Sequence, residues 1–495
     1  MDHLIMGFAV ALEPMNLLYG FIGVFIGTFI GILPGLGPPG AIAILLPVTF
    51  SLSPISSLIM LAGIYYGAMY GGSITSILLN IPGEAASVVT CIDGYQMARQ
   101  GRAGPALGIS VFSSFIAGTL GICGLVVFAP PLALFALRFG PPEYFSLMVA
   151  GLVVLSYMTQ GSVLKGLMMS TVGLILGTVG TDPITGIGRY TFNMLELSDG
   201  IGFIPAVMGL FGISEVLLTI ENRDEREIFK TSIRNLLPSR KDWIESAWPI
   251  GRGSVLGFFL GILPGGGAVL SSFVSYALEK RLSRNPAEFG KGAIAGVAGP
   301  EAANNSASSG AFIPVLSLGI PSNAATAILL GALLIYGVQV GPLLMHNEPK
   351  LFWGVIASMY IGNVMLLVLN LPMIGFWVRL LRIPYRFLFP VILLFCLLGV
   401  YSVNSSAVEI IFMVVFGLIG YLMRKYRYDP APLVLAIIIG PMLEMNLRQS
   451  LILSHGNLSI FTQRPISGVL LVVSAVLLVV PILQNYKKTR RTRNA

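Results

Sequence analysis

Two clusters of helix-breaking residues carry much of the binding chemistry that this sequence can offer. The first runs from Pro34 to Gly37 and the second from Pro264 to Gly267, each directly after an apolar run. Proline removes a backbone donor and clashes with the preceding turn, so each cluster is expected to interrupt a helix. An interrupted helix exposes N–H groups that suit an anion and carbonyl groups that suit Na⁺.

A run of small polar residues, GPEAANNSASSG, spans positions 299–310. Its amides and hydroxyls can ligate the oxygens of an anion or a desolvated Na⁺, although they could instead form an interhelical hydrogen-bonding face. An acid inside a membrane is costly without a role, so Glu301 is a candidate for cation or proton coupling, with a structural partner as the alternative. Gly299-Pro300 favours a break in the helix, which would let Asn304 and Asn305 face one ligand.

Two Ile-Pro elbows complete the polar features. They read NIPGE at 80–84 and GIPSN at 319–323, and Ser322 and Asn323 are typical of residues that cap a following helix. The candidate substrate-binding residues are therefore Pro34, Gly35, Gly37, Pro264, Gly265, Gly266, Gly267, Asn304, Asn305, Ser306, Ser308, Ser309, Gly310, Ser322 and Asn323. The ion-coupling candidates are Glu301, Asn80, Ser73 and Thr75.

The elements that must position these residues are membrane helices. Of 495 residues, 55% are hydrophobic and 11% charged, against about 25% charged in soluble domains. Apolar stretches recur along the whole chain, which predicts an all-α polytopic membrane protein. The net charge of +8 is attributed to cytoplasmic loops and not to nucleic acid. No nucleophile elbow, P-loop or metal-ligand spacing is present, so we expect neither an enzyme, nor a cofactor, nor a metal other than a coupling Na⁺.

The sequence repeats internally. Residues 23–37 align without gaps on 253–267, with nine of fifteen positions identical. Residues 65–85 then align on 304–324, with seven of 21 identical, including both Ile-Pro pairs. Two blocks that share their order and their Gly and Pro positions indicate a duplicated unit.

Basic loops predict the orientation of the two copies. Six Lys or Arg lie within 223–241 and further ones within 280–291, so both regions are expected to be cytoplasmic. The arm 250–263 has 14 residues, which reach about 21 Å and fall short of the ~30 Å hydrocarbon core. We therefore predict a re-entrant hairpin at 250–278 and an equivalent one around Pro34.

Full crossings are expected after each hairpin. The predicted spans are 55–80, 105–128, 143–160, 162–180 and 203–220, then 291–320, 351–371, 386–402, 405–424 and 430–447, with a last one at 466–485. Five crossings per copy place the second copy inverted. Residues 324–345 are expected to be partly inserted or peripheral. The predicted units are the first repeat at 1–220, a cytoplasmic linker at 221–249, the inverted second repeat at 250–447, and a C-terminal helix with a basic tail at 448–495.

Several stretches, among them GILPGLGPPGAIAILLP, GRGSVLGFFLGILPGGG and FGKGAIAGVAGPEAANNSASSGAFIPVLSLGIP, closely resemble the large membrane subunit of tripartite tricarboxylate transporters, the TctA family. The resemblance implies a multi-pass protein of the bacterial inner membrane that imports tricarboxylates or related organic carboxylates by Na⁺ or proton symport. It also implies two partners, a small four-span membrane subunit and a periplasmic solute-binding protein. The alternatives are a stand-alone secondary transporter for another small organic anion and a channel.

Overall fold

The computed structural model describes residues 2–33, 36–158, 162–182, 184–221, 236–263, 267–380 and 385–493. Helices dominate these residues, and the strands found among them, β1 (Gly180–Thr181) and β2 (Gly188–Arg189), form one antiparallel pair. By length and composition, six described segments could cross a membrane: Pro14–Ile32, Ala103–Ala136, Phe203–Glu221, Pro349–Asn370, Ala407–Lys425 and Ala431–Leu453. The prediction of an all-α polytopic membrane protein is confirmed.

The first half of the chain begins with a pair of short-linked helices and continues through longer ones. Its elements are α1 (Asp2–Ala11), α2 (Pro14–Ile32), α3 (Gly37–Thr49), α4 (Pro54–Leu79), η1 (Ala85–Ser87), α5 (Val88–Arg99), α6 (Ala103–Ala136), α7 (Pro141–Met158), α8 (Val163–Gly177), η2 (Leu195–Leu197), α9 (Phe203–Val207), the π-helical η3 (Met208–Ile213) and α10 (Ser214–Glu221).

The second half follows a similar order. Its elements are α11 (Arg240–Ile262), α12 (Gly267–Leu282), η4 (Pro286–Glu288), α13 (Ala295–Gly310), α14 (Phe312–Leu318), α15 (Ala324–Ile335), α16 (Leu344–Asn347), α17 (Pro349–Asn370), α18 (Ile374–Leu380), α19 (Tyr385–Asn404), α20 (Ala407–Lys425), α21 (Ala431–Leu453), α22 (Ile460–Gln463) and α23 (Pro465–Arg493).

Matching rows of glycine pack the first helices of each half. On α2, a Cβ added at Gly23, Gly27 or Gly31 would lie 2.2–2.5 Å from a backbone oxygen of α4. On α11, a Cβ at the aligned Gly253, Gly257 or Gly261 would lie 2.2–2.4 Å from a backbone oxygen of α13. Small residues one turn apart let two helix backbones approach closely inside a membrane. The aligned blocks therefore share a packing mode as well as sequence.

The helix α11 corrects one step of the sequence argument. It begins at Arg240, where Ser239 and Asp242 form a capping box, and it runs for 23 residues. At about 1.5 Å per residue, the helix is roughly 35 Å long, but its first turns are charged and it is not among the described segments that are apolar enough to cross a membrane. The first arm is therefore longer than predicted because a charged, well-capped turn extends the helix, though not its apolar part, toward the N-terminus. The re-entrant course of 250–278 remains a prediction.

The elbows end one helix and begin another. Asn80 terminates α4 with a left-handed φ of 56°, and Gly319 terminates α14 with a φ of 70°. Asn323 then caps α15, because its side chain accepts the Thr326 N–H. The cap prediction is confirmed for Asn323, whereas Ser322 caps nothing among the described residues. The predicted span 291–320 consists of α13 and α14, and within 324–345 the twelve-residue α15 is largely buried.

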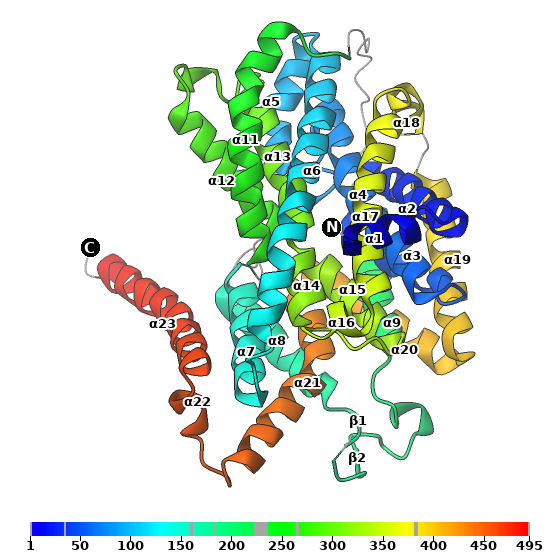
Figure 1. The fold of residues 1–495 in the computed structure, drawn as a ribbon, viewed down its shortest axis with the longest axis vertical. Coiled ribbons are helices and arrows are strands. Elements are labelled where there is room, and N and C mark those ends of the chain that lie inside the picture. The colour runs from blue at the N-terminus through cyan, green and yellow to red at the C-terminus, as the bar shows by residue number, and fades with distance from the viewer. Residues whose placement is uncertain are drawn as a thin grey trace.

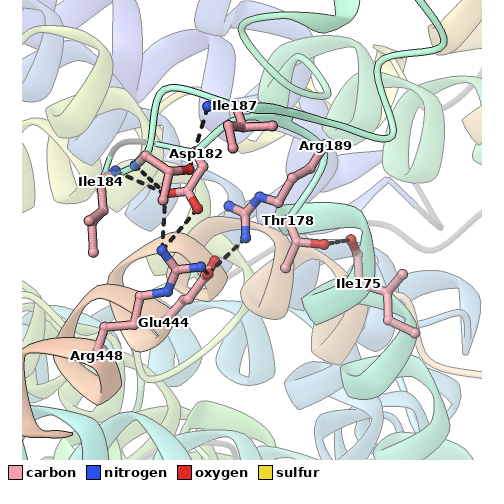
Figure 2. A network of polar contacts seen from close by, with 9 residues as sticks. Ile175, Thr178, Asp182, Ile184, Ile187, Arg189, Glu444 and Arg448 are labelled. Carbon is pink, nitrogen blue, oxygen red and sulfur yellow. Dashed lines mark hydrogen bonds and ion pairs between the residues drawn. The ribbon is translucent and has the colours of Figure 1, made fainter.

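Figure 1 shows an elongated molecule, with α5 and the start of α11 near one end of the long axis and the β1–β2 segment at the other. The helix α23 lies to one side and packs on α7, where Ser146 and Ser467 are hydrogen-bonded at 2.6 Å. Ion pairs connect the segment that carries β1 and β2 to α21, as Figure 2 shows. Asp182 pairs with Arg448 at 2.9 Å, and Arg189 pairs with Glu444 at 2.7 Å.

Candidate functional site

A cavity of about 610 Å³ lies where four helical segments begin. Its lining includes the first residues of α3, α12 and α15, and the Pro82–Ala85 elbow that leads into η1 and α5. The aligned residues Gly37 and Gly267 both line it. Positions far apart in the sequence, and from both halves of the chain, therefore meet at one cavity.

The beginnings of α3 and α12 differ in their capacity to donate hydrogen bonds. The first N–H groups of a helix have no partner within the helix and can bind an anion. In α12 the first four residues, Gly267 to Leu270, all carry an N–H and all line the cavity. In α3 the second and third residues are Pro38 and Pro39, which have no N–H. Of these two helix starts, α12 therefore offers the larger number of donors for an anion.

Two matched hydrogen bonds join the halves beside the cavity. The Asn323 amide donates from Nδ2 to the Tyr65 hydroxyl at 3.1 Å. The Asn304 amide donates from Nδ2 to Glu84 Oε1 at 3.2 Å. In the sequence repeat Tyr65 aligns with Asn304, and Glu84 aligns with Asn323. Each contact is therefore the exchanged counterpart of the other, the pattern that a two-fold relation between halves produces.

The buried carboxylate of Glu301 lies in a cluster of hydroxyl groups. It accepts hydrogen bonds from Ser73 at 2.7 Å, from Ser114 at 3.3 Å and from Thr90. The Asn305 amide in turn donates to the Ser114 hydroxyl at 2.7 Å. No basic side chain among the described residues contacts Glu301, so its charge is balanced only by hydrogen bonds.

The rest of the predicted polar run packs helices together. Contrary to the expected break at Gly299-Pro300, α13 is continuous from Ala295 to Gly310, with Pro300 inside the helix. Proline is tolerated inside such a helix where neighbouring helices pack around it, and α6, α11 and α12 all pack on α13. Asn304 and Asn305 consequently point to different partners, Glu84 and Ser114. The remaining side chains donate to backbone carbonyls: Ser306 to Ser254, Ser308 to Asn304, and Ser309 to Gly118 and Asn305.

The other predicted positions fall into four groups. Gly37, Gly267 and Asn323 line the cavity. Ser322 is buried without a hydrogen bond from its hydroxyl, and Gly310 packs on the Phe258 backbone. Thr75 bonds to the carbonyl of Gly72, and Asn80 terminates α4, so neither touches Glu301. Pro34, Gly35, Pro264, Gly265 and Gly266 lie outside the described residues.

Sequence reasoning missed several residues of this region. Thr90 and Ser114 complete the hydroxyl cluster, and Glu84, Arg424 and Asp429 are the charged residues of the cavity wall. The alignment of Glu84 with the predicted site residue Asn323 was a signal that could have identified it. Arg424 and Asp429 carry no such signal, because they come from the α20–α21 turn, outside both aligned blocks.

The comparisons with known proteins identify the family. The family model described as "Tripartite tricarboxylate transporter TctA family" matches residues 17–435. The chain belongs to the TctA family. A relative from Agrobacterium vitis, the "uncharacterized 52.8 kDa protein in TAR-I ttuC' 3'region", is 49% identical over 489 residues, which cover 99% of this chain and 97% of the relative.

A second relative from the same organism is shorter. This "uncharacterized protein in TAR-II ttuC' 3'region" is 48% identical over 234 residues, covering 47% of this TctA-family chain and 97% of the relative. No solved structure matches the chain. Membership of the family makes the chain a large membrane subunit of tripartite transporter type, and this agrees with its apolar helices.

Proposed function

We propose that this chain is the permease subunit of a binding-protein-dependent secondary transporter that imports tricarboxylates or related organic carboxylates by symport with Na⁺ or protons. The observation that supports this most is the cavity at which α3, α12 and α15 begin, since substrate sites of repeat-built transporters lie at helix breaks. A volume of about 610 Å³ accommodates a small organic acid.

The N-terminus of α12 is the proposed anchor for a substrate carboxylate. Its N–H groups at Gly267 to Leu270 and its positive dipole end favour an anion without an arginine clamp. Pro38 and Pro39 make the start of α3 an apolar wall instead. The carboxylate end of the substrate would then lie on α12, with its carbon skeleton toward α3.

Glu301 is the proposed site of a coupling cation. Its carboxylate and the hydroxyls of Ser73, Thr90 and Ser114 provide five oxygen atoms, the ligand type that hard cations such as Na⁺ prefer. The carboxylate has no basic partner among the described residues, so a bound cation would neutralise it. A symporter needs such a site close to the substrate, and α13 carries both Glu301 and Asn304, which donates a hydrogen bond to the cavity residue Glu84.

The two halves are proposed to be inverted repeats. The exchanged contacts Asn323–Tyr65 and Asn304–Glu84, and the matched glycine rows, support a two-fold relation. The Lys/Arg bias supports a cytoplasmic position for the basic regions 223–241 and 280–291, and an odd number of crossings in each half would then put the two-fold axis in the membrane plane. The location is proposed to be the bacterial inner membrane, and the partners a small four-span subunit and a periplasmic solute-binding protein.

Uptake of labelled citrate and succinate into cells tests the proposal. The chain would be coexpressed with a small membrane subunit and a solute-binding protein of the same transporter type, with Na⁺ and pH gradients imposed separately. We expect uptake that requires the binding protein and one of the gradients. Uptake without the binding protein would instead identify a stand-alone transporter. Substrate flux that depends on neither the Na⁺ gradient nor the pH gradient would identify a channel.

The proposed anchor on α12 has its own test. Ala268→Pro removes one N–H while leaving a residue that the first turn of a helix tolerates. A hydrogen bond to a charged group contributes about 1.5–3 kcal/mol, so substrate affinity should fall at least tenfold. Ala268→Ser keeps the N–H and serves as the matched control. Equal substrate affinity of the two variants would show that the substrate carboxylate does not bind at the start of α12.

A further inference from the structure

The cavity wall carries more negative than positive charge. Among the described residues its charged members are Glu84, Arg424 and Asp429. Arg424 is already paired with the carboxylate of Glu215, which lies behind the wall. Asp429 accepts the Ala431 N–H at 2.9 Å at the start of α21. An organic anion that enters this cavity therefore meets an excess of carboxylates, which opposes its binding unless positive charge enters with it.

The two buried acids nearest the cavity differ in what surrounds them. Glu301 is surrounded by hydroxyl oxygens, which are ligands for a metal cation. Glu84 instead accepts from nitrogen donors, the Ala86 N–H at 2.6 Å and the Asn304 amide at 3.2 Å. Such donors cannot ligate Na⁺, which requires oxygen atoms. In the described arrangement these contacts supply no oxygen ligand for a metal cation, which favours a proton at Glu84.

The amide of Asn304 is suited to both protonation states of Glu84. Its Nδ2 donates to the carboxylate, while its Oδ1 is buried without a described hydrogen-bond partner. An amide that turns over by 180° exchanges these two atoms at nearly the same positions. Oδ1 would then accept the proton of a Glu84 carboxylic acid. An unpartnered acceptor beside an acid is costly, and this exchange removes the cost when the acid is protonated.

We propose that Glu84 binds one proton together with each substrate molecule, as a second coupling site distinct from Glu301. The proposal rests on the carboxylate transport proposed above. A proton from water at the cavity mouth converts the Glu84 carboxylate to the acid as the substrate carboxylate enters. The acid O–H then donates to the substrate or to Asn304 Oδ1, and the proton leaves to water when the substrate is released.

Few other ionisable groups face Glu84. Across α4 and α13, they are the hydroxyl of Tyr65 and the carboxylate of Glu301, and across the cavity they are Arg424 and Asp429. The thiol of Cys91 on α5 also interacts with Glu84. On α12, Glu279 lies near the far end of the helix and is paired with Arg252 at 2.5 Å. On α5, Asp93 is held by the N–H groups of Gly290, Gly292 and Ala293 and by Tyr276. Asp429 and Glu301 are thus the groups whose titration the controls must separate.

Carbodiimide labelling tests the proton site without any substrate. Dicyclohexylcarbodiimide reacts with protonated carboxyl groups in apolar surroundings, and peptide mass spectrometry locates the product. We expect Glu84 to be labelled in the purified full-length chain, with labelling that falls as the pH rises from about 5.5 to about 8.5. Absence of label on Glu84, or label that is independent of pH, would overturn the proposal.

Proton uptake on binding provides the second arm. Citrate and succinate would be titrated calorimetrically into the chain in buffers of different ionisation enthalpy, with ligand protonation subtracted. Wild type and Glu301→Gln should each take up about one proton per ligand bound. Their affinity should weaken by about tenfold per pH unit once Glu84 is ionised in the free chain. Glu84→Gln keeps an oxygen that can accept the Ala86 N–H, and it should take up no proton and bind independently of pH.

The outcomes separate the two proposals. Binding with unchanged proton uptake in Glu84→Gln would refute the role of Glu84 and leave carboxylate transport intact. Loss of uptake in Asp429→Asn, but not in Glu84→Gln, would assign the proton to Asp429 instead. No binding of either carboxylate would count against the proposed function, while the labelling result would still decide whether Glu84 takes up a proton.

Discussion

The matched glycine rows predict a specific pattern of stability changes. A Cβ at Gly257 would lie 2.2 Å from the carbonyl oxygen of Ala303, and one at Gly27 would lie 2.5 Å from that of Ile64. Ordinary carbon–oxygen contacts are more than an ångström longer, so the two helix backbones must separate. Overpacking costs about 1–3 kcal/mol, and an obstructing backbone places the cost at the upper end of that range. The higher helix propensity of alanine offsets about 1 kcal/mol of this cost, so each substitution should lower the free energy of unfolding by roughly 2 kcal/mol.

The control lies on the same helix. A Cβ at Gly251 meets no atom within 4 Å, so Gly251→Ala should gain only the helix propensity. Thermal unfolding of the detergent-solubilised chain, followed by fluorescence-detected size exclusion, would rank the variants. We expect Gly27→Ala and Gly257→Ala to melt several degrees below wild type, and Gly251→Ala to melt at or above it. Equal melting of all three would show that the glycine rows do not determine helix approach.

Further predictions concern the membrane topology and the β1–β2 segment that ion pairs hold against α21. Single cysteines would replace Lys241 and Arg281 in a background without the three native cysteines. Both should react from the cytoplasmic side, because residues 250–278 are predicted to enter and leave the membrane on one face. Reaction from opposite sides would refute the re-entrant hairpin. The Ile184 N–H and Arg448 hold the pKa of Asp182 well below its usual range. Asp182→Asn should therefore lower the melting temperature at pH 7, and this difference should shrink as the pH falls below the ordinary aspartate pKa of about 3.9, since a lowered pKa stabilises only above that value. A difference that stays constant down to about pH 3 would contradict this.

Much of the helical order could be predicted because its signals are local. Apolar runs, Ile-Pro elbows and positions such as Asn323 are visible in the sequence, and α4 (Pro54–Leu79) lies within one residue of its predicted span at both ends. The errors arose where local signals compete. Pro300 was expected to break a helix, but α13 continues through it, because packed neighbouring helices tolerate a proline that an isolated helix would not. The start of α11 was placed too late because charged residues from Arg240 onward were assigned to a loop, although a capping box makes them helical.

The candidate site was harder to predict because its members meet only in three dimensions. The polar run 299–310 was selected for its composition, yet most of its side chains face neighbouring helices. Which of them approach the cavity depends on the rotation of α13, and that rotation is set by glycine contacts with α11. Arg424 and Asp429 reach the cavity from a turn that lies more than a hundred residues later in the chain. No spacing rule in a single sequence connects them to Glu84.

The repeat is closer to symmetric in its backbone than in its chemistry, and the difference bears on transport. Equivalent elbows place Glu84 in one half and Asn323 in the other, and their partners are Asn304 and Tyr65 respectively. The aligned helix starts carry Pro38 and Pro39 in α3 and four N–H donors in α12. Similar backbones in both halves would let them exchange conformations at little cost, which is what alternating access requires of opposed repeats. If the proposed proton site at Glu84 and the proposed anion anchor on α12 hold, the different side chains of the two halves would favour a single substrate orientation throughout the exchange.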